Sequence, residues 1–185
     1  MSDIEIRPDF VTEEEEKTIV DLVMSQFNNK NSSRQSLQFG NFHPCSDGIV
    51  NHNVMPEIFD TLRHRLIDAG ILDKLPDSVS VNIYPPKSTI LPHVDNKRDC
   101  GNVIPVIGLL ADCPLIFRSM KNGAIDETSS ALKETYTSVR RGVFIMKGEK
   151  RHEWTHQTSP IDTLRISVVF RTRKNEQCCI QTKNN

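Results

Sequence analysis

The sequence lacks the features that mark membrane and secreted proteins. No apolar run approaches the roughly 20 residues that a membrane-spanning helix needs. The N-terminus is acidic and has neither the basic region of a secretory signal nor the arginine-rich character of a transit peptide. The net charge is −1, so no global basic field would attract nucleic acid. We therefore expect a soluble cytoplasmic or nuclear protein without a membrane partner.

Cysteine is present in a number that argues against cross-links. The chain has five cysteines, an odd count, and no two of them form a Cys-x-x-Cys pair. This pattern fits reduced intracellular thiols better than a disulfide framework or a structural zinc site. At 185 residues, with 25% charged and 37% hydrophobic residues, the chain has the balance of one globular domain. We expect a monomer.

The most informative stretch spans residues 79–95. It begins with an alternating pattern that predicts a strand and ends in His93, Val94 and Asp95. In an extended chain, residues two apart point the same way, so the imidazole and the carboxylate would lie side by side. Together they would form two thirds of a facial iron site made of two histidines and one carboxylate. Taken alone, the motif is more typical of an ordinary surface loop than of a metal site.

A third ligand must come from another part of the chain. The candidates are His152 and His156, which flank Trp154. We prefer His156, because Trp154 is a large apolar residue that would wall the site. The alternative is that both histidines lie on the surface.

The last predicted strand, 164–171, carries two arginines. Alternation places Arg165, Ser167, Val169 and Arg171 on one face, with the arginines about 20 Å apart at ~3.3 Å per residue. If this face lines a lumen, the arginines need anionic partners, because an unpaired buried guanidinium is costly. A dicarboxylate cosubstrate would be such a partner. The alternative is an edge strand with solvated arginines.

The remaining pattern predicts two helices followed by many short strands, an α+β chain whose strands form a sandwich or barrel. Thr12 and Glu15 form a capping box at the start of the first helix, and 55–72 is the second. Residues 28–53 are polar and aperiodic, which predicts either a long loop, of the kind that often forms a closing lid, or a set of irregular hairpins. Phe39 and Phe42, with two nearby histidines, would stack on a flat substrate there. Alternatively, the two phenylalanines tack the loop onto the core.

The combination of motifs resembles the AlkB family of iron(II)- and 2-oxoglutarate-dependent dioxygenases, in a divergent animal-type branch. The resemblance rests on Asn82 and Tyr84, then His93 and Asp95, then His156, then the strand from Arg165 to Arg171. It covers about 79–172 well and the N-terminal part more loosely. It implies a double-stranded β-helix, or jelly roll, with N-terminal flanking helices. Within one domain, 1–185, it implies a helical support over 1–76, a catalytic core over 77–172 and a polar tail over 173–185.

The resemblance also implies roles for individual residues. Iron(II) would be bound by His93, Asp95 and His156. The cosubstrate 2-oxoglutarate, used with O2, would be bound by the residues at five motif positions: Asn82, Tyr84, Arg165, Ser167 and Arg171. Ser167 stands where many members of the family have Asn. No catalytic residue is implied beyond the iron centre.

Three functions stay open at the level of sequence. The first is oxidative demethylation of N-alkylated bases in single-stranded RNA or DNA, with Phe39, Phe42, Lys97, Arg98 and Trp154 as substrate contacts. Phosphates would then be contacted by the following basic residues: Lys97, Arg98, Arg140, Arg141, Lys147, Lys150 and Arg151. Members that repair nucleic acids often have a second acidic residue where this chain has Lys97. The second function is oxidation of a protein substrate, and the third is a non-catalytic jelly-roll binding module.

Overall fold

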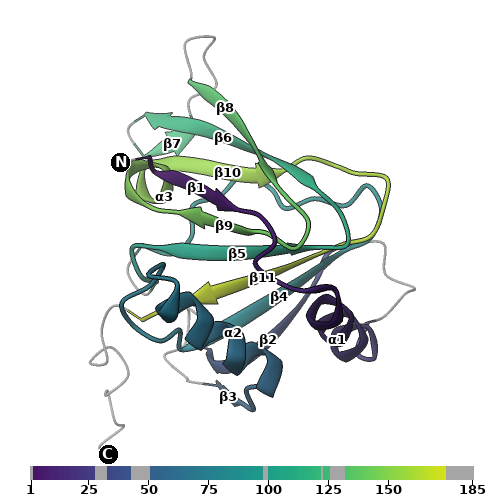
Figure 1. Cartoon of the computed structure of the whole chain (residues 1–185). Coiled ribbons are helices and arrows are strands. Elements are labelled where there is room, and N and C mark those ends of the chain that lie inside the picture. The colour runs from purple at the N-terminus through teal and green to yellow at the C-terminus, as the bar shows by residue number, and fades with distance from the viewer. Residues whose placement is uncertain are drawn as a thin grey trace, which may run out of the picture.

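The computed structural model describes residues 2–27, 33–42, 51–97, 100–121, 123–125 and 132–173. The chain folds into two antiparallel sheets that lie face to face, with two helices outside (Figure 1). This is the jelly roll with N-terminal flanking helices that the resemblance implied. No helix within the described ranges is both long and apolar enough to span a membrane.

The larger sheet has seven strands and carries most of the polar residues predicted for the site. Their order across the sheet is β1-β9-β5-β11-β4-β2-β3. The strands are β1 (Ile4–Arg7), β2 (Gln35–Phe42), β3 (Asn51–Asn53), β4 (Ser78–Tyr84), β5 (Ile104–Leu109), β9 (Val143–Met146) and β11 (Arg165–Arg171). The last strand in the sequence, β11, therefore lies near the middle of the sheet.

The smaller sheet faces the polar side of the larger one. Its central strand β6 pairs with β10 on one side and with β7 and β8 on the other. The strands are β6 (Cys113–Lys121), β7 (Ala124–Ile125), β8 (Lys133–Ser138) and β10 (Trp154–Thr158). A short helix, α3 (Gly148–His152), leads into β10.

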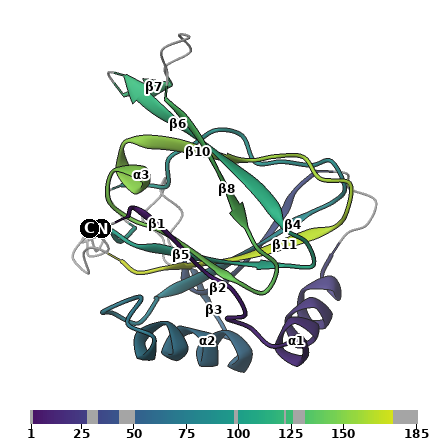
Figure 2. The same ribbon diagram turned by 45° about the horizontal axis from the view of Figure 1, so that its top comes forward.

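The first two helices cover the outer face of the larger sheet (Figure 2). Helix α1 (Glu13–Met24) begins with the predicted capping box, in which Thr12 and Glu15 bond each other's backbone N–H. Helix α2 (Glu57–Asp68) begins after Pro56. Both predicted helices are therefore present. Helix α1 ends at an apolar residue, Met24, and α2 ends a few residues before the end of the predicted range 55–72.

The alternation of β4 and β11 produces two separate cores. Between the helices and the larger sheet lie apolar side chains of both elements, including Ile19, Val23, Phe59, Leu62, Val79, Val81, Ile83, Ile166, Val168 and Phe170. Between the sheets lie Ile104, Leu115, Phe117, Phe144, Trp154 and Val169. The polar residues of β4 and β11 share this second, inner space because side chains two apart point the same way.

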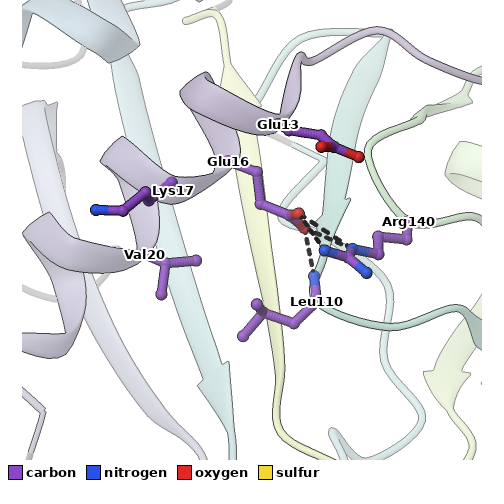
Figure 3. A pocket seen from close by; sticks show the side chains of 6 residues that line it. All are labelled: Glu13, Glu16, Lys17, Val20, Leu110 and Arg140. Atoms are coloured by element: carbon purple, nitrogen blue, oxygen red, sulfur yellow. Dashed lines mark hydrogen bonds and ion pairs between the residues drawn. The ribbon is translucent and has the colours of Figure 1, made fainter.

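Helix α1 is tied to the sheet through Glu16, which points toward Leu110 and Arg140 (Figure 3). The side chain of Glu16 is only 5% exposed. Its carboxylate accepts hydrogen bonds from the Leu110 backbone N–H at 2.7 Å and from the Arg140 guanidinium. Leu110 has a φ of 71°, which is uncommon for leucine. The ion pair and this backbone bond together fix α1 beside the end of β5.

Where the structure describes residues 28–53, the predicted long loop or lid is wrong, whereas the alternative of hairpins is confirmed in part, because β2 and β3 pair antiparallel. Residues 35–42 are not a loop or lid but form β2, which pairs along β4, and 51–53 form β3. The sequence does not predict β2 as a regular strand because the segment is rich in polar residues, as is the inner face of this sheet. Residues 28–32 and 43–50 lie outside the described ranges.

Candidate metal and cosubstrate site

Three side chains that could bind a metal converge between the two sheets. One potential ligand atom from each of His93, Asp95 and His156 lies within 4.8 Å of the others. His156 belongs to β10, and His93 lies in the connection after β4. The backbones of the two histidines exchange hydrogen bonds of 3.1 and 2.9 Å, and their rings are 4.3 Å apart. The pairing explains why His156, rather than His152 on α3, joins the group.

The His93 imidazole is held in one orientation. Its Nδ1 lies 2.8 Å from the carbonyl oxygen of Leu91, so Nδ1 carries the proton and donates it. The lone pair of Nε2 is then available for a metal, and Nε2 lies 4.0 Å from Asp95 Oδ1. The side chain of His93 is 32% exposed, so this ligand lies at the open side of the group.

Asp95 is held as a carboxylate. Burial alone would raise its pKa, but the charge and hydrogen bond of Arg171 and the nearby His156 lower the pKa to about 2. Burial lowers the pKa of His156 to about 4. An ionised carboxylate and a neutral imidazole are the forms in which these residues bind metals.

The donor set fits a divalent iron ion. Two imidazoles and one carboxylate form the facial triad of non-haem iron(II) sites. The Nδ1 of His156 is buried and has no hydrogen-bond partner among the described residues. A buried nitrogen in this position is satisfied if the ring binds a metal or water.

A polar stripe runs from this group across the inner face of β4 and β11. Residues of the two strands pair in register, Asn82 opposite Ser167 and Tyr84 opposite Arg165. The Asn82 side-chain nitrogen lies 3.5 Å from Ser167 Oγ. All five residues predicted to bind the cosubstrate, including Arg171, therefore lie on one surface.

Arg165 is buried without a carboxylate partner among the described residues. It is 2% exposed, donates to Ser138 Oγ at 3.3 Å, and its Nε has no partner there. The guanidinium carbon lies 5.3 Å from the centre of the Tyr84 ring. Because a buried cation without a counter-charge is costly, this environment fits the carboxylate of a bound dicarboxylate.

Arg171 connects the metal group to the edge of the sheet. One nitrogen donates to Asp95 Oδ1 at 3.0 Å and another donates to Ser80 Oγ at 2.8 Å. Ser80 donates in turn to the Gln38 side chain of β2. Sequence reasoning did not find Gln38, since its segment showed no periodicity. Ser80 lies two residues before Asn82 and so shares its face by strand alternation, but the sequence indicates no partner for it.

Arg151 was predicted to contact phosphates, and that prediction is wrong. Its side chain is fully buried, and its nitrogens donate to three backbone carbonyls, those of Asp95, Asn96 and Gly101, at 2.9, 2.9 and 3.3 Å. It therefore holds the segment that follows the carboxylate ligand in place.

The other predicted phosphate contacts that the structure describes are paired with carboxylates. The pairs are Lys97–Glu153, Arg140–Glu16, Arg141–Glu13, Lys147–Glu5 and Lys150–Glu134. Binding of phosphates would have to compete with these pairs, so the structure does not support a basic rim made by these residues. Arg98 lies outside the described residues.

Two of the predicted substrate contacts are buried in the cores. Phe39 packs against Phe59 of α2, with ring centres 5.2 Å apart, so the prediction that it stacks on a substrate is wrong. Trp154 is 7% exposed between the sheets, and the Lys150 ammonium lies 2.9 Å from its ring centre. It therefore packs in the core between the sheets and does not reach a substrate. The Phe42 side chain lies outside what the structure describes.

A jelly roll with two histidines and an aspartate at one end of a polar stripe and a buried arginine at the other defines a non-haem iron(II) oxygenase. Residues 4–171 match the family model of the 2OG-Fe(II) oxygenase superfamily. The chain belongs to this superfamily and is AlkB-like. It is a dioxygenase whose cofactors are iron(II) and 2-oxoglutarate, with O2 as cosubstrate.

Named relatives differ in length from this chain. It is 31% identical over 179 residues to the uncharacterized protein L905 of Acanthamoeba polyphaga mimivirus, covering 88% of this chain and 81% of that protein. It is 25% identical to the tRNA (carboxymethyluridine(34)-5-O)-methyltransferase alkbh8 of Xenopus tropicalis, covering 86% of this chain but only 26% of that protein. The RNA demethylase ALKBH9B of Arabidopsis thaliana is 27% identical, over 77% of this chain and 30% of its own length.

Among solved structures, OsALKBH1 superimposes with a TM-score of 0.65 at 13% identity. The superposition covers 93% of this chain and 99% of that one. At this identity the likeness supports the fold.

Proposed function

We propose that His93, Asp95 and His156 bind the iron(II) and that Asn82, Tyr84, Arg165, Ser167 and Arg171 bind 2-oxoglutarate. The convergence of the three ligands at one end of the stripe, with the unpaired Arg165 at the other, supports this assignment. Bound iron(II) would supply O2-dependent hydroxylation of a C–H bond, coupled to conversion of 2-oxoglutarate to succinate and CO2.

The side chains prepare the site for that chemistry in separate ways. Arg165 would pair with the distal carboxylate of 2-oxoglutarate through fork-like hydrogen bonds. Arg171 keeps Asp95 ionised and fixes one of its oxygens. The Leu91 carbonyl fixes the His93 tautomer, so that Nε2 faces the metal.

We propose as substrate an N-alkylated base in single-stranded nucleic acid, with RNA favoured by the names of the relatives. The observation that supports this substrate is the surface beside His93, the most exposed of the three proposed ligands. Leu91 is 77% exposed there, and the neighbouring His93 ring is partly exposed. An apolar side chain beside an imidazole offers a surface on which a flat base can stack. Hydroxylation of an N-methyl carbon there would release formaldehyde and the unmodified base.

The test is the release of succinate and formaldehyde by iron-loaded protein at fixed 2-oxoglutarate. Methylated single-stranded RNA and DNA are compared with unmethylated strands of the same sequence, and His156→Ala serves as the inactive control. Equal amounts of formaldehyde and succinate, only with methylated strands, are expected. Succinate without formaldehyde on every strand would contradict the nucleic-acid substrate while showing a live oxygenase.

Oxidation of a protein side chain is the second candidate. The ion pairs that engage the basic residues predicted to contact phosphates favour it. The cations that would contact phosphates are engaged with Glu13, Glu16, Glu5, Glu134 and Glu153. A protein substrate needs no such contacts. A gain of 16 Da on a peptide from a library, dependent on 2-oxoglutarate, would support this candidate.

A further inference from the structure

A third guanidinium approaches the cosubstrate stripe from the edge of the sheet. Arg34 lies directly before β2 and donates from Nη1 to the side-chain oxygen of Asn82 at 2.5 Å. Asn82 is 7% exposed on β4, whereas Arg34 is exposed. Ser36 of β2 lies opposite Asn82 in register, so Arg34, two residues earlier, is on the same side of the sheet.

This contact determines which way the Asn82 amide points. A guanidinium has donors and no acceptor, so the atom that it touches must be the amide oxygen. The amide nitrogen then points away from Arg34, toward β11, where it lies 3.5 Å from Ser167 Oγ. Without such a partner, an asparagine can present either its oxygen or its nitrogen to the same neighbour.

The orientation matters because the cosubstrate is a dianion. A carboxylate accepts hydrogen bonds and repels an amide oxygen, so only one of the two orientations of Asn82 is productive. The Arg34 contact selects the productive one. The guanidinium also adds one positive charge at the edge of a site that must hold two carboxylates.

We propose that Arg34 is a positioning residue for 2-oxoglutarate, acting by fixing the Asn82 amide with its nitrogen toward the cosubstrate. The proposal rests on the assignment of Asn82 to 2-oxoglutarate made under the proposed function. It does not depend on what the substrate is.

The test is calorimetric binding of 2-oxoglutarate to the Mn(II)-loaded protein without substrate. Arg34→Met is expected to weaken 2-oxoglutarate binding about tenfold, the effect of one hydrogen bond to a charged group. Mn(II) binding should not change, because Arg34 touches none of the three ligands. Arg34→Lys, which keeps a donor and the charge, should lie within about threefold of the parent. Lys74→Met, which removes an exposed cation elsewhere, is the matched control and should have no effect.

A double-mutant cycle separates positioning from a general charge effect. In an Asn82→Ala background, Arg34→Met should weaken 2-oxoglutarate binding by less than about twofold, because there is no amide left to orient. An equal loss in both backgrounds, or no loss in either, would overturn the proposal. A loss of RNA binding with unchanged 2-oxoglutarate binding would also overturn it.

The same measurements show which proposal has failed. If Asn82→Ala itself leaves 2-oxoglutarate binding unchanged, the assignment of Asn82 is wrong. If Asn82→Ala weakens binding and Arg34→Met does not, only the positioning role is wrong. Circular dichroism of each variant verifies folding, and Arg34→Gln replaces Arg34→Met if the methionine variant is unfolded.

Discussion

Arg165 and Arg171 lie on the same face of β11, but their partners differ. Arg171 is paired with Asp95, the proposed iron ligand, whereas Arg165 has no carboxylate partner in the part of the chain that the structure describes and contacts Ser138 and the face of Tyr84. The first arginine is therefore satisfied by the protein itself. The second has a positive charge that the cosubstrate would balance, so it should dominate the affinity for 2-oxoglutarate.

Arg165→Ala is expected to raise the 2-oxoglutarate concentration needed for half-maximal turnover by about tenfold or more, because a buried ion pair with the cosubstrate is lost. The measurement is succinate release against 2-oxoglutarate concentration. Ser138→Ala, which removes only the hydroxyl beside Arg165, should change the requirement less than about threefold. A normal requirement in Arg165→Ala would contradict the assignment of the stripe.

Arg151→Met is expected to lower the free energy of unfolding by about 3 kcal/mol, since three backbone carbonyls, two of them in buried hydrogen bonds, would lose their donors. Urea denaturation measures this loss. Lys147→Met is the control: its partly exposed pair with Glu5 should contribute within about 1 kcal/mol. A loss below about 1 kcal/mol in Arg151→Met would show that the clamp on the Asp95 segment is not needed for stability.

Some of these residues were predictable from the sequence and others were not. His93 and Asp95 are two apart in an extended segment, and Arg165 and Arg171 follow strand alternation, so simple periodicity placed them. Arg151 carries no such signal. Whether a basic residue beside a turn lies in solvent or under a loop depends on tertiary packing, which its neighbours in sequence do not encode.

At the level of elements, the position of α1 depends on one buried carboxylate. Glu16 neutralises Arg140 and satisfies the N–H of Leu110, a residue in the left-handed region. Burial raises the pKa of Glu16, but the hydrogen bonds from Arg140 and Leu110 lower it more, so the net pKa lies below the ordinary 4.5.

Glu16→Gln is expected to cost about 2 kcal/mol of stability at neutral pH, because the ion pair with Arg140 is lost. The folded-state pKa of Glu16 is lower than its unfolded-state pKa. Its contribution is therefore complete above about pH 5 and disappears as the pH falls through the folded-state value. Urea midpoints of parent and variant should converge toward acid pH. Glu14→Gln, an exposed neighbour on α1, is the control, and a difference that stays constant with pH would contradict this origin.

Among the elements, the capped helices and the apolar strands were predicted, but β2 was not. The capping box of Thr12 and Glu15 is a local signal, and so is the apolar alternation of β4. In β2, Gln38 bonds to Ser80 on the polar face of the sheet and Ser36 is exposed, so the segment looks like a loop. A strand that borders a functional lumen loses the hydrophobic alternation by which strands are predicted.

At the level of the whole molecule, the ion-paired rim bears on how a nucleic acid would bind. If all seven predicted cations contacted phosphates, the affinity for a single strand would fall with salt with a log–log slope of about −5, at ~0.7 per contact. Because five of these cations are paired with carboxylates and Arg151 is buried against backbone carbonyls, we expect a slope shallower than about −2. Fluorescence anisotropy of a methylated oligonucleotide between about 50 and 200 mM salt measures it. A slope near −5 would show that the ion pairs open on binding.

The central place of β11 has a consequence for how the enzyme is made. Its neighbours β4 and β5 are synthesised earlier, and among the described strands only β11 pairs with both of them. A nascent chain whose synthesis has not reached residue 165 therefore contains His93, Asp95 and His156, the three proposed iron ligands, but neither Arg165 nor Arg171. Such a nascent chain, or a prematurely terminated one, lacks the guanidinium that would retain 2-oxoglutarate. We therefore expect 2-oxoglutarate binding, and with it turnover, only after β11 has been synthesised.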